Sequence, residues 1–212
     1  MFTATFKDVS TANTFNINGI QIYNTDGTVY DVNNRILLQK MDGEGYYLDP
    51  AYNYRSTKGG WCNKANLVTD ITLRSGEAVC LNNGSGAAKK IRVSGQVELN
   101  PISFTLPTGF TLMGNMTPAT INMNDITVYY KPDGSSEWEI YPTNNRVTLQ
   151  KMDSEGYYLD PAYNYRSTKN GWCNKANLVT DVEFAPGEAF CINNGTGSEI
   201  QLRYKSPVSS QQ

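Results

Sequence analysis

The sequence contains no histidine. This absence excludes the Ser-His-Asp and Cys-His arrangements of nucleophilic catalysis, because both need a histidine base. No long basic block appears either: the chain has 18 lysines and arginines and 20 acidic residues, and its net charge is −2. A nucleic-acid partner, which requires a basic surface, is therefore not expected. No apolar run approaches the roughly 20 residues of a membrane-spanning helix, so no membrane span is expected.

Cysteines are few, and none of the four belongs to a CxxC pair. Without such a pair or a histidine, a zinc site is not expected. The cysteines stand at one spacing in two pairs, Cys62 with Cys80 and Cys173 with Cys191. We expect one disulfide within each pair, as in proteins from oxidising compartments. The alternative is four buried free thiols.

A recognisable secretory leader is also missing. Met1 is followed by FTATFKDVS, which has neither the charged start nor the apolar core of such a leader. The chain is then either a mature form whose leader has been removed or a cytoplasmic protein. The expected disulfides favour the first interpretation, so we expect a secreted, extracellular or cell-surface protein.

The sequence does contain a long internal repeat. Residues 35–70 recur as residues 146–181, with 32 of 36 positions identical. Weaker similarity continues on both sides, and the second copy has five extra residues around KPDGSSEWEIYP. We expect two tandem domains, residues 1–100 and residues 101–212.

Both copies have the pattern of β-structure. Short segments such as ITVYYK and WEIYP flank turns rich in glycine, proline and aspartate, which is typical of hairpins. No stretch shows a sustained helical period. The sequence therefore predicts an all-β fold of two tandem β-sandwich domains, jelly-roll-like, each with one intradomain disulfide.

Acidic residues beside glycine turns are the candidates for chemistry. Asp42, Glu44 and Asp49 recur in the second copy and offer carboxylates for glycoside hydrolysis or oxygen ligands for Ca²⁺. Their spacing matches no motif of known geometry, and such residues are usually solvated. We expect no enzyme, no cofactor and no metal.

The repeated aromatic segment YYLDPAYNYRSTK is the better candidate for binding. Tyrosine offers an apolar face with a polar edge, and tyrosine and arginine are enriched where proteins bind one another. Trp61 is expected in the core, and Tyr46 and Tyr47 are expected on opposite sides of a strand. The residues expected to form an interface or a ligand site are Tyr47, Tyr52, Tyr54, Arg55, Tyr158, Tyr163, Tyr165 and Arg166.

The order of these motifs resembles a family of tandem β-repeat proteins from the secreted and cell-surface proteomes of Verrucomicrobia, Lentisphaerae and related bacteria. The matching pieces are LQKMDGEGYY, GWCNKANLVTD, SGEAVCLNNGSG, RVSGQVEL and TLPTGFTLMGNMTPATINMNDI. The first copy has RSGEAV where the second has the family's proline, in APGEAF. The resemblance covers nearly the whole chain and implies a β-fold and an extracellular location. Its motifs are structural, so it implies no catalytic residue.

Three explanations account for two nearly identical copies. The first is a recent duplication or a recombination tract, although the flanks have diverged more than the centre. The second is self-assembly, in which each copy meets the same kind of neighbour. The third is bivalent binding of a glycan. We favour a secreted structural protein that self-associates into an extracellular filament or layer, and the alternative is a bivalent carbohydrate-binding module.

Overall fold

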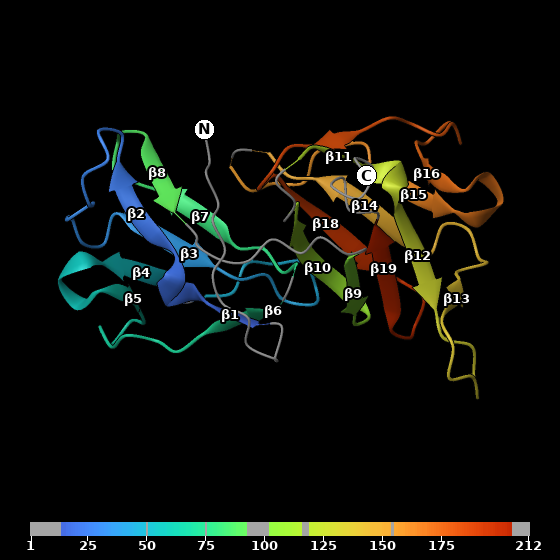
Figure 1. Ribbon diagram of the computed structural model, residues 1–212, viewed down its shortest axis with the longest axis horizontal. Helices are drawn as coiled ribbons and strands as arrows, with labels where there is room; N and C mark the ends of the chain where they lie inside the picture. Colours follow the sequence, from blue (N-terminus) through green and yellow to red (C-terminus); the bar gives the residue numbers. More distant parts are fainter. Residues whose placement is uncertain are drawn as a thin grey trace, which may run out of the picture. The chain divides into compact units, whose positions relative to one another are not determined.

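The computed structural model describes residues 14–49, 51–74, 76–92, 102–115, 119–153 and 155–204. Regular structure in these residues is β-strand, apart from four single-turn 3-10 helices. The all-β prediction is therefore confirmed. None of the described segments forms a helix long and apolar enough to cross a membrane. The chain makes two compact units, with β1 to β8 in the first and β9 to β19 in the second (Figure 1).

The first unit contains three antiparallel sheets among its described residues. Their strand orders are β5-β4-β3-β7, β2-β8 and β1-β6. The elements are β1 (Thr14–Asn16), η1 (Ile17–Gly19), β2 (Gln21–Asn24), β3 (Ile36–Gln39), β4 (Tyr52–Arg55), η2 (Ser56–Lys58), β5 (Gly60–Cys62), β6 (Thr72–Arg74), β7 (Cys80–Asn83) and β8 (Lys89–Arg92).

The second unit repeats this plan with longer sheets. Their strand orders are β10-β18-β14-β15-β16, β13-β12-β19-β9 and β11-β17. The elements are β9 (Ile102–Leu106), β10 (Gly109–Gly114), β11 (Ile121–Asn122), η3 (Met123–Asp125), β12 (Ile126–Tyr130), β13 (Glu139–Ile140), β14 (Val147–Lys151), β15 (Tyr163–Arg166), η4 (Ser167–Lys169), β16 (Gly171–Cys173), β17 (Glu183–Phe184), β18 (Ala189–Asn194) and β19 (Ile200–Tyr204).

The strands of the second unit bury alternate side chains, as a sheet with one covered face requires. Along β19, Ile200, Leu202 and Tyr204 are buried, whereas Gln201 and Arg203 are half-buried. Buried side chains from both large sheets join one core of 18 described residues. This arrangement is sandwich-like, as the sequence predicts. In the first unit, nine buried residues among those described form the core.

A tryptophan stands at the centre of each core. Trp61 and Trp172 are both fully buried, which confirms the prediction for Trp61. Each indole lies edge-on to a tyrosine ring, Trp61 to Tyr54 and Trp172 to Tyr165, with ring centroids 5.4 Å apart in both units. The indole N–H donates to a backbone carbonyl, so its polar atom is satisfied in the core.

One asparagine fixes the GW motif of each unit. Asn18 Oδ1 accepts a hydrogen bond from Trp61 N at 2.8 Å, and Asn18 Nδ2 donates to Thr69 O at 2.6 Å. A Cβ atom on Gly60 would lie 2.3 Å from Asn18 Oδ1, so glycine is required there. Asn124 makes the equivalent bonds in the second unit.

The predicted disulfides are wrong, because all four cysteines are free thiols. Cys62 lies on β5 and Cys80 on β7, with β4 and β3 between them; Cys173 and Cys191 are separated in the same way by β15 and β14. Three strand spacings of about 4.8 Å place each pair about 14 Å apart across the sheet. A disulfide requires Cα atoms within about 7 Å.

Burial disfavours the thiolate form of Cys191 and Cys80. Burial raises the pKa of Cys191 to about 11, against the opposing effect of a hydrogen bond with Tyr158. Burial also raises the pKa of Cys80. Cys80 and Cys191 are therefore poor nucleophiles near neutral pH. Without disulfides, the cysteines give no argument for an oxidising compartment.

The single difference between residues 44–70 and residues 155–181 also has a structural reason. Gly59 and Asn170 occupy the position after η2 and η4, with φ angles of 71° and 50°. This left-handed conformation is favourable for glycine and tolerated by asparagine. The substitution therefore leaves the turn unchanged.

Candidate functional site

The acidic candidates build turns. Asp153 Oδ1 accepts hydrogen bonds from Tyr157 N at 2.8 Å and Glu155 N at 3.0 Å. Asp42 Oδ1 accepts one from Tyr46 N at 2.9 Å. These carboxylates hold the hairpin turn after β3 and after β14 in shape. In the part of the chain that the structure describes, no group of three or more Asp, Glu, Cys or His residues could hold a metal ion.

The repeated GEA motif is structural as well. Glu77 accepts a hydrogen bond from Arg74 N at 2.9 Å and forms an ion pair with Lys40 at 2.7 Å. Glu188 in the second unit accepts from Ala185 N and pairs with Lys151 at 2.5 Å. The motif therefore closes a turn and connects it to a neighbouring strand.

Two of the predicted binding residues belong to the core. Tyr54 is 7% exposed and Tyr165 is 1% exposed. Both lie on the covered face of their strands, β4 and β15, against the buried tryptophan. Burial raises the pKa of both phenols. Their placement excludes them from any binding surface, and the prediction for these two residues is corrected accordingly.

The other predicted residues are not brought together into one site. Tyr52 and Tyr163 are half-buried and pack against the core of their own unit. Arg55 and Arg166, beside them on the same strands, are half-buried too. Tyr47 is half-buried, and Tyr158 is 37% exposed with its ring 6.1 Å from that of Phe110. These side chains serve mainly to cover the sheets.

A different set of repeated side chains is exposed to solvent. The aromatic members are Tyr46 and Tyr157, with 69% and 70% exposure. Leu67 and Leu178 are 62% and 61% exposed, while Val68 and Val179 are 49% and 47% exposed. We call these residues, together with the exposed Leu48 and Leu159, the loop patch of each unit.

Two loops of each unit contribute the loop patch, the loop after β3 or β14 and the loop after β5 or β16. In the first unit β3, β4 and β5 are consecutive antiparallel neighbours, so the loop after β3 and the loop after β5 emerge at the same end. An ion pair between Lys64 Nζ and Asp49 Oδ2, 3.4 Å long, joins these two loops. Sequence reasoning concentrated on rings and missed the aliphatic pair in NLVTD. The sequence feature that could have identified this pair is the occurrence of two large apolar residues, Leu67 and Val68, between turn-forming residues.

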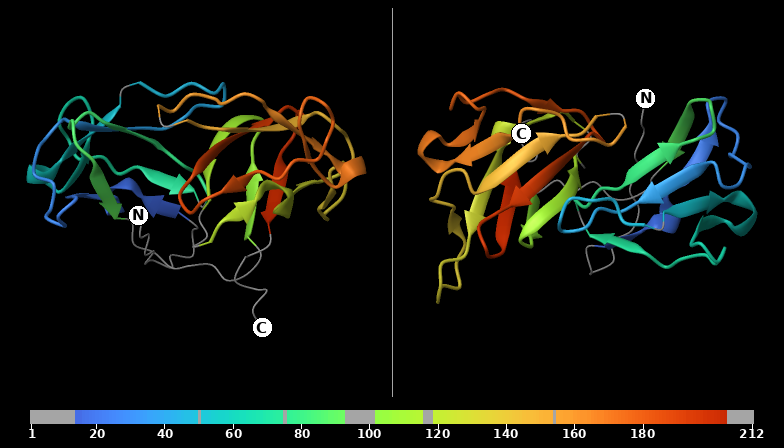
Figure 2. Two further views of the ribbon diagram at one scale, coloured as in Figure 1. Left: turned by 90° about the horizontal axis from the view of Figure 1, so that it is seen from above. Right: turned by 180° about the vertical axis from the view of Figure 1, so that it is seen from behind.

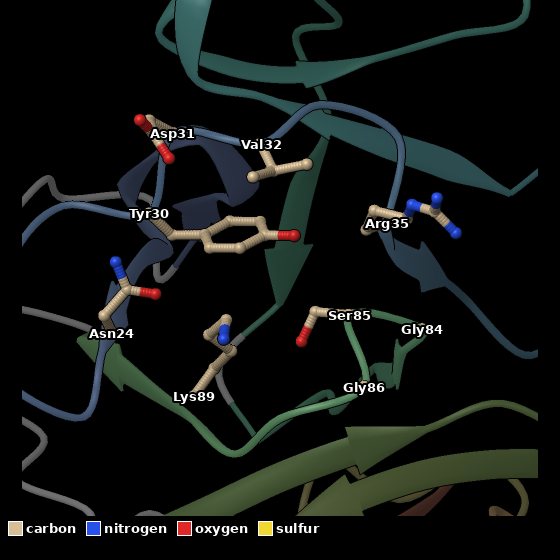
Figure 3. Close-up of a pocket in the computed structure, with 9 residues that line it drawn as sticks. All are labelled: Asn24, Tyr30, Asp31, Val32, Arg35, Gly84, Ser85, Gly86 and Lys89. Atoms are coloured by element: carbon tan, nitrogen blue, oxygen red, sulfur yellow. The ribbon is translucent and has the colours of Figure 1, made fainter.

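A pocket of about 510 Å³ opens in the first unit beside β2 and β8. Figure 3 shows the Tyr30 ring crossing its middle, with Lys89 and Ser85 on one side and Asp31 on the other. Lys89 Nζ lies over the Tyr30 ring, 5.1 Å from its centroid. The Ser85 hydroxyl donates to Asn83 Oδ1 at 2.6 Å. The lining holds two cations, one carboxylate, an amide and two hydroxyl groups.

Bulkier or less polar side chains stand at the equivalent positions of the second unit. Register pairs Asn24 with Lys89 in the first unit and Tyr130 with Ile200 in the second. The ring of Tyr130 packs edge-on against Tyr141, with centroids 5.6 Å apart. Smaller and more polar residues therefore open the pocket of the first unit.

Comparisons with protein-family models, with curated proteins and with solved structures found no match for this chain.

Proposed function

We propose that this protein is a structural, non-catalytic subunit built from two jelly-roll-like β-sandwich repeats. It self-associates into a filament or layer at the cell surface or in the extracellular space. The observation that carries the proposal is the loop patch, which each unit displays with nearly the same exposure. The extracellular location rests on the family resemblance alone.

The repeated residues divide into two groups. Buried residues such as Trp61 and turn residues such as Asp42 are repeated because both units need them to fold. Leu67 and Tyr46 are also repeated, yet they are 62% and 69% exposed. Large apolar side chains that stay exposed in clusters mark surfaces that meet a partner. A subunit that meets identical neighbours uses the same surface more than once.

The test is electron microscopy and light scattering of the protein at micromolar concentration without added ligand. We expect regular assemblies, and we expect Leu67→Ser combined with Leu178→Ser to reduce them strongly. Val32→Ser is the matched control, because Val32 is also exposed (48%) but is replaced by Thr143 in the second unit. Dispersed monomers of the unmodified protein would refute the proposal.

A bivalent carbohydrate-binding module is the second candidate. Tyr46 and Tyr157 favour it, because exposed rings at identical positions could each stack on a sugar. A glycan that binds the folded chain raises its melting temperature. We expect Tyr46→Ala with Tyr157→Ala to abolish that increase. A broad glycan panel that produces no increase rejects this candidate.

A further inference from the structure

One sheet edge of the first unit is open and basic. Strand β8 ends the two-stranded sheet β2-β8, and no described residue pairs with its outer edge. Its sequence carries Lys89, Lys90 and Arg92, and the last two are exposed. Ile91 lies between them and is only half-buried. Unpaired edges accept further strands, and edge lysines restrict which strands can pair there.

The second unit shows what belongs at this edge. Its strand β19 corresponds to β8, and β9 pairs along the whole of it. Leu202, the counterpart of Ile91, lies opposite Phe104 and is fully buried. The first unit is therefore missing one strand among its described residues, and with it the cover over Ile91.

An acidic edge is present in the second unit. Strand β13 ends the sheet β13-β12-β19-β9, and no described residue pairs with its outer edge. Glu137 and Glu139 are exposed, Trp138 is half-buried and Ile140 is 49% exposed. The hairpin that carries them includes the five residues that the first copy lacks, and it projects beyond the sheets (Figure 1 and the right-hand view of Figure 2).

We propose that β8 of one copy pairs antiparallel with residues 137–140 of a second copy. The register places Lys90 opposite Glu139 and Arg92 opposite Glu137, which makes two cross-strand ion pairs. Opposite charges directly across an antiparallel pair are stabilising, and like charges are destabilising. The same register places Trp138 opposite Ile91, where it supplies apolar cover.

The backbone of both edges suits this register. Ile22 O accepts a hydrogen bond from Tyr30 N on the side of β2 that faces away from β8. The cross-strand pair of Ile22 with Ile91 is therefore non-hydrogen-bonded. Ile91 consequently directs its N–H and C=O away from β2, toward the outer edge of β8. Tyr141 N donates to Val128 O, so Ile140 and Trp138 direct theirs outward by the same alternation. The outward groups of the two edges therefore face each other.

The pairing adds a second contact surface, besides the loop patch, to the proposed self-association and rests on that function. The basic edge belongs to one unit and the acidic edge to the other, so the contact joins different surfaces of successive copies. Such head-to-tail contacts continue into filaments unless the rotation closes a ring. Two basic edges, or two acidic edges, repel each other.

Charge reversal tests the pairing in the full chain. One variant carries Lys90→Glu with Arg92→Glu, and the other carries Glu137→Lys with Glu139→Lys. Light scattering coupled to gel filtration measures association of each variant alone and of an equimolar mixture. Circular dichroism confirms folding. Arg35→Glu with Arg146→Glu is the control, since it reverses two exposed cations at other positions.

We expect each variant alone to need at least about tenfold more protein to associate, because two attractive pairs become repulsive. The mixture should regain assembly, since each reversed edge then meets an opposite charge on the other variant. Variants that associate alone like the unmodified protein overturn the pairing but leave self-association intact. Loss without rescue in the mixture also overturns it. An unmodified protein that stays monomeric overturns the proposed function itself.

Discussion

The two units share most of their sequence, yet they differ where their sheets end. In the shared stretch, GW, GEA and the acidic turn are built with the same hydrogen bonds in both units. At the edges, β9 pairs with β19, whereas none of the described residues pairs with the outer edge of β8, and the β12–β13 hairpin is longer in the second unit. The comparison teaches that the common buried and turn residues make the fold, whereas the differing residues give each unit a distinct edge.

The pocket of the first unit also lies where the two units differ in sequence. Tyr130 and Ile200 stand in the second unit at the positions where Asn24 and Lys89 line the pocket of the first unit. We therefore expect the first unit to be the less stable of the two.

Removal of the central tryptophan should have the largest effect. Trp61→Ala and Trp172→Ala each leave a cavity in a fully packed core and should lower the free energy of unfolding of the affected unit by about 3–5 kcal/mol. Because a pocket already opens beside the core residue Tyr30 in the first unit, we expect Trp61→Ala to be the more damaging change. Urea denaturation followed by fluorescence measures both. Equal losses would show that the two cores are equivalent after all.

Removal of the asparagine that holds the GW motif should lower the free energy of unfolding by a smaller amount. Asn18→Ala removes the acceptor for Trp61 N and the donor for Thr69 O, at a cost of about 1–3 kcal/mol. Asn124→Ala should have a matching effect in the second unit, because its bonds have nearly the same lengths. Chemical denaturation of the two variants tests the match. A neutral result in either unit would contradict the structural role given to this residue.

Replacing the pocket residues of the first unit by their counterparts from the second unit should stabilise the first unit. Asn24→Tyr with Lys89→Ile introduces the residues of the second unit and should add about 1 kcal/mol through apolar burial and an edge-on contact with Tyr30. Asn24→Tyr alone is the control, because Lys89 still lies over that ring. Denaturant midpoints measure the difference. Destabilisation by the double change would mean that the backbones diverge here.

Exchange of the turn residues should have the smallest effect. Gly59→Asn and Asn170→Gly each place a tolerated residue in a left-handed position, so stability should change by only a few tenths of a kcal/mol. Gly59→Val is the contrasting control, because a β-branched residue is strained there. Thermal unfolding compares the three. A large loss from the asparagine exchange would reveal an unseen requirement for glycine.

The sequence predicts the parts of this structure that depend on local pattern. Alternation and turn residues indicate an all-β chain, and the place of Trp61 beside a cysteine indicates a core residue. Strand order is not local, because it depends on which edges meet in three dimensions. The disulfides were mispredicted for that reason: equal spacing in the chain hid the two strands between Cys62 and Cys80.

The candidate site was harder to predict than the fold. In the sequence, the neighbours of Tyr54 are those expected around an interface tyrosine. Only the alternation of side chains along β4 in the structure shows that Tyr54 faces the core. Leu67 has the cues of a core residue, and only its place in a loop shows that it is exposed. The complementary charges of Lys90 and Glu139 become meaningful once both strands are known to lie at sheet edges.

The most direct measurement is carbodiimide cross-linking of an equal mixture of ¹⁴N-labelled and ¹⁵N-labelled protein, followed by mass spectrometry. This reagent joins a lysine amine to a carboxylate only where the two are in contact. The account predicts mixed-isotope peptides that link Lys90 to Glu139. Links confined to single-isotope peptides, or mixed links that never involve these two edges, would contradict it.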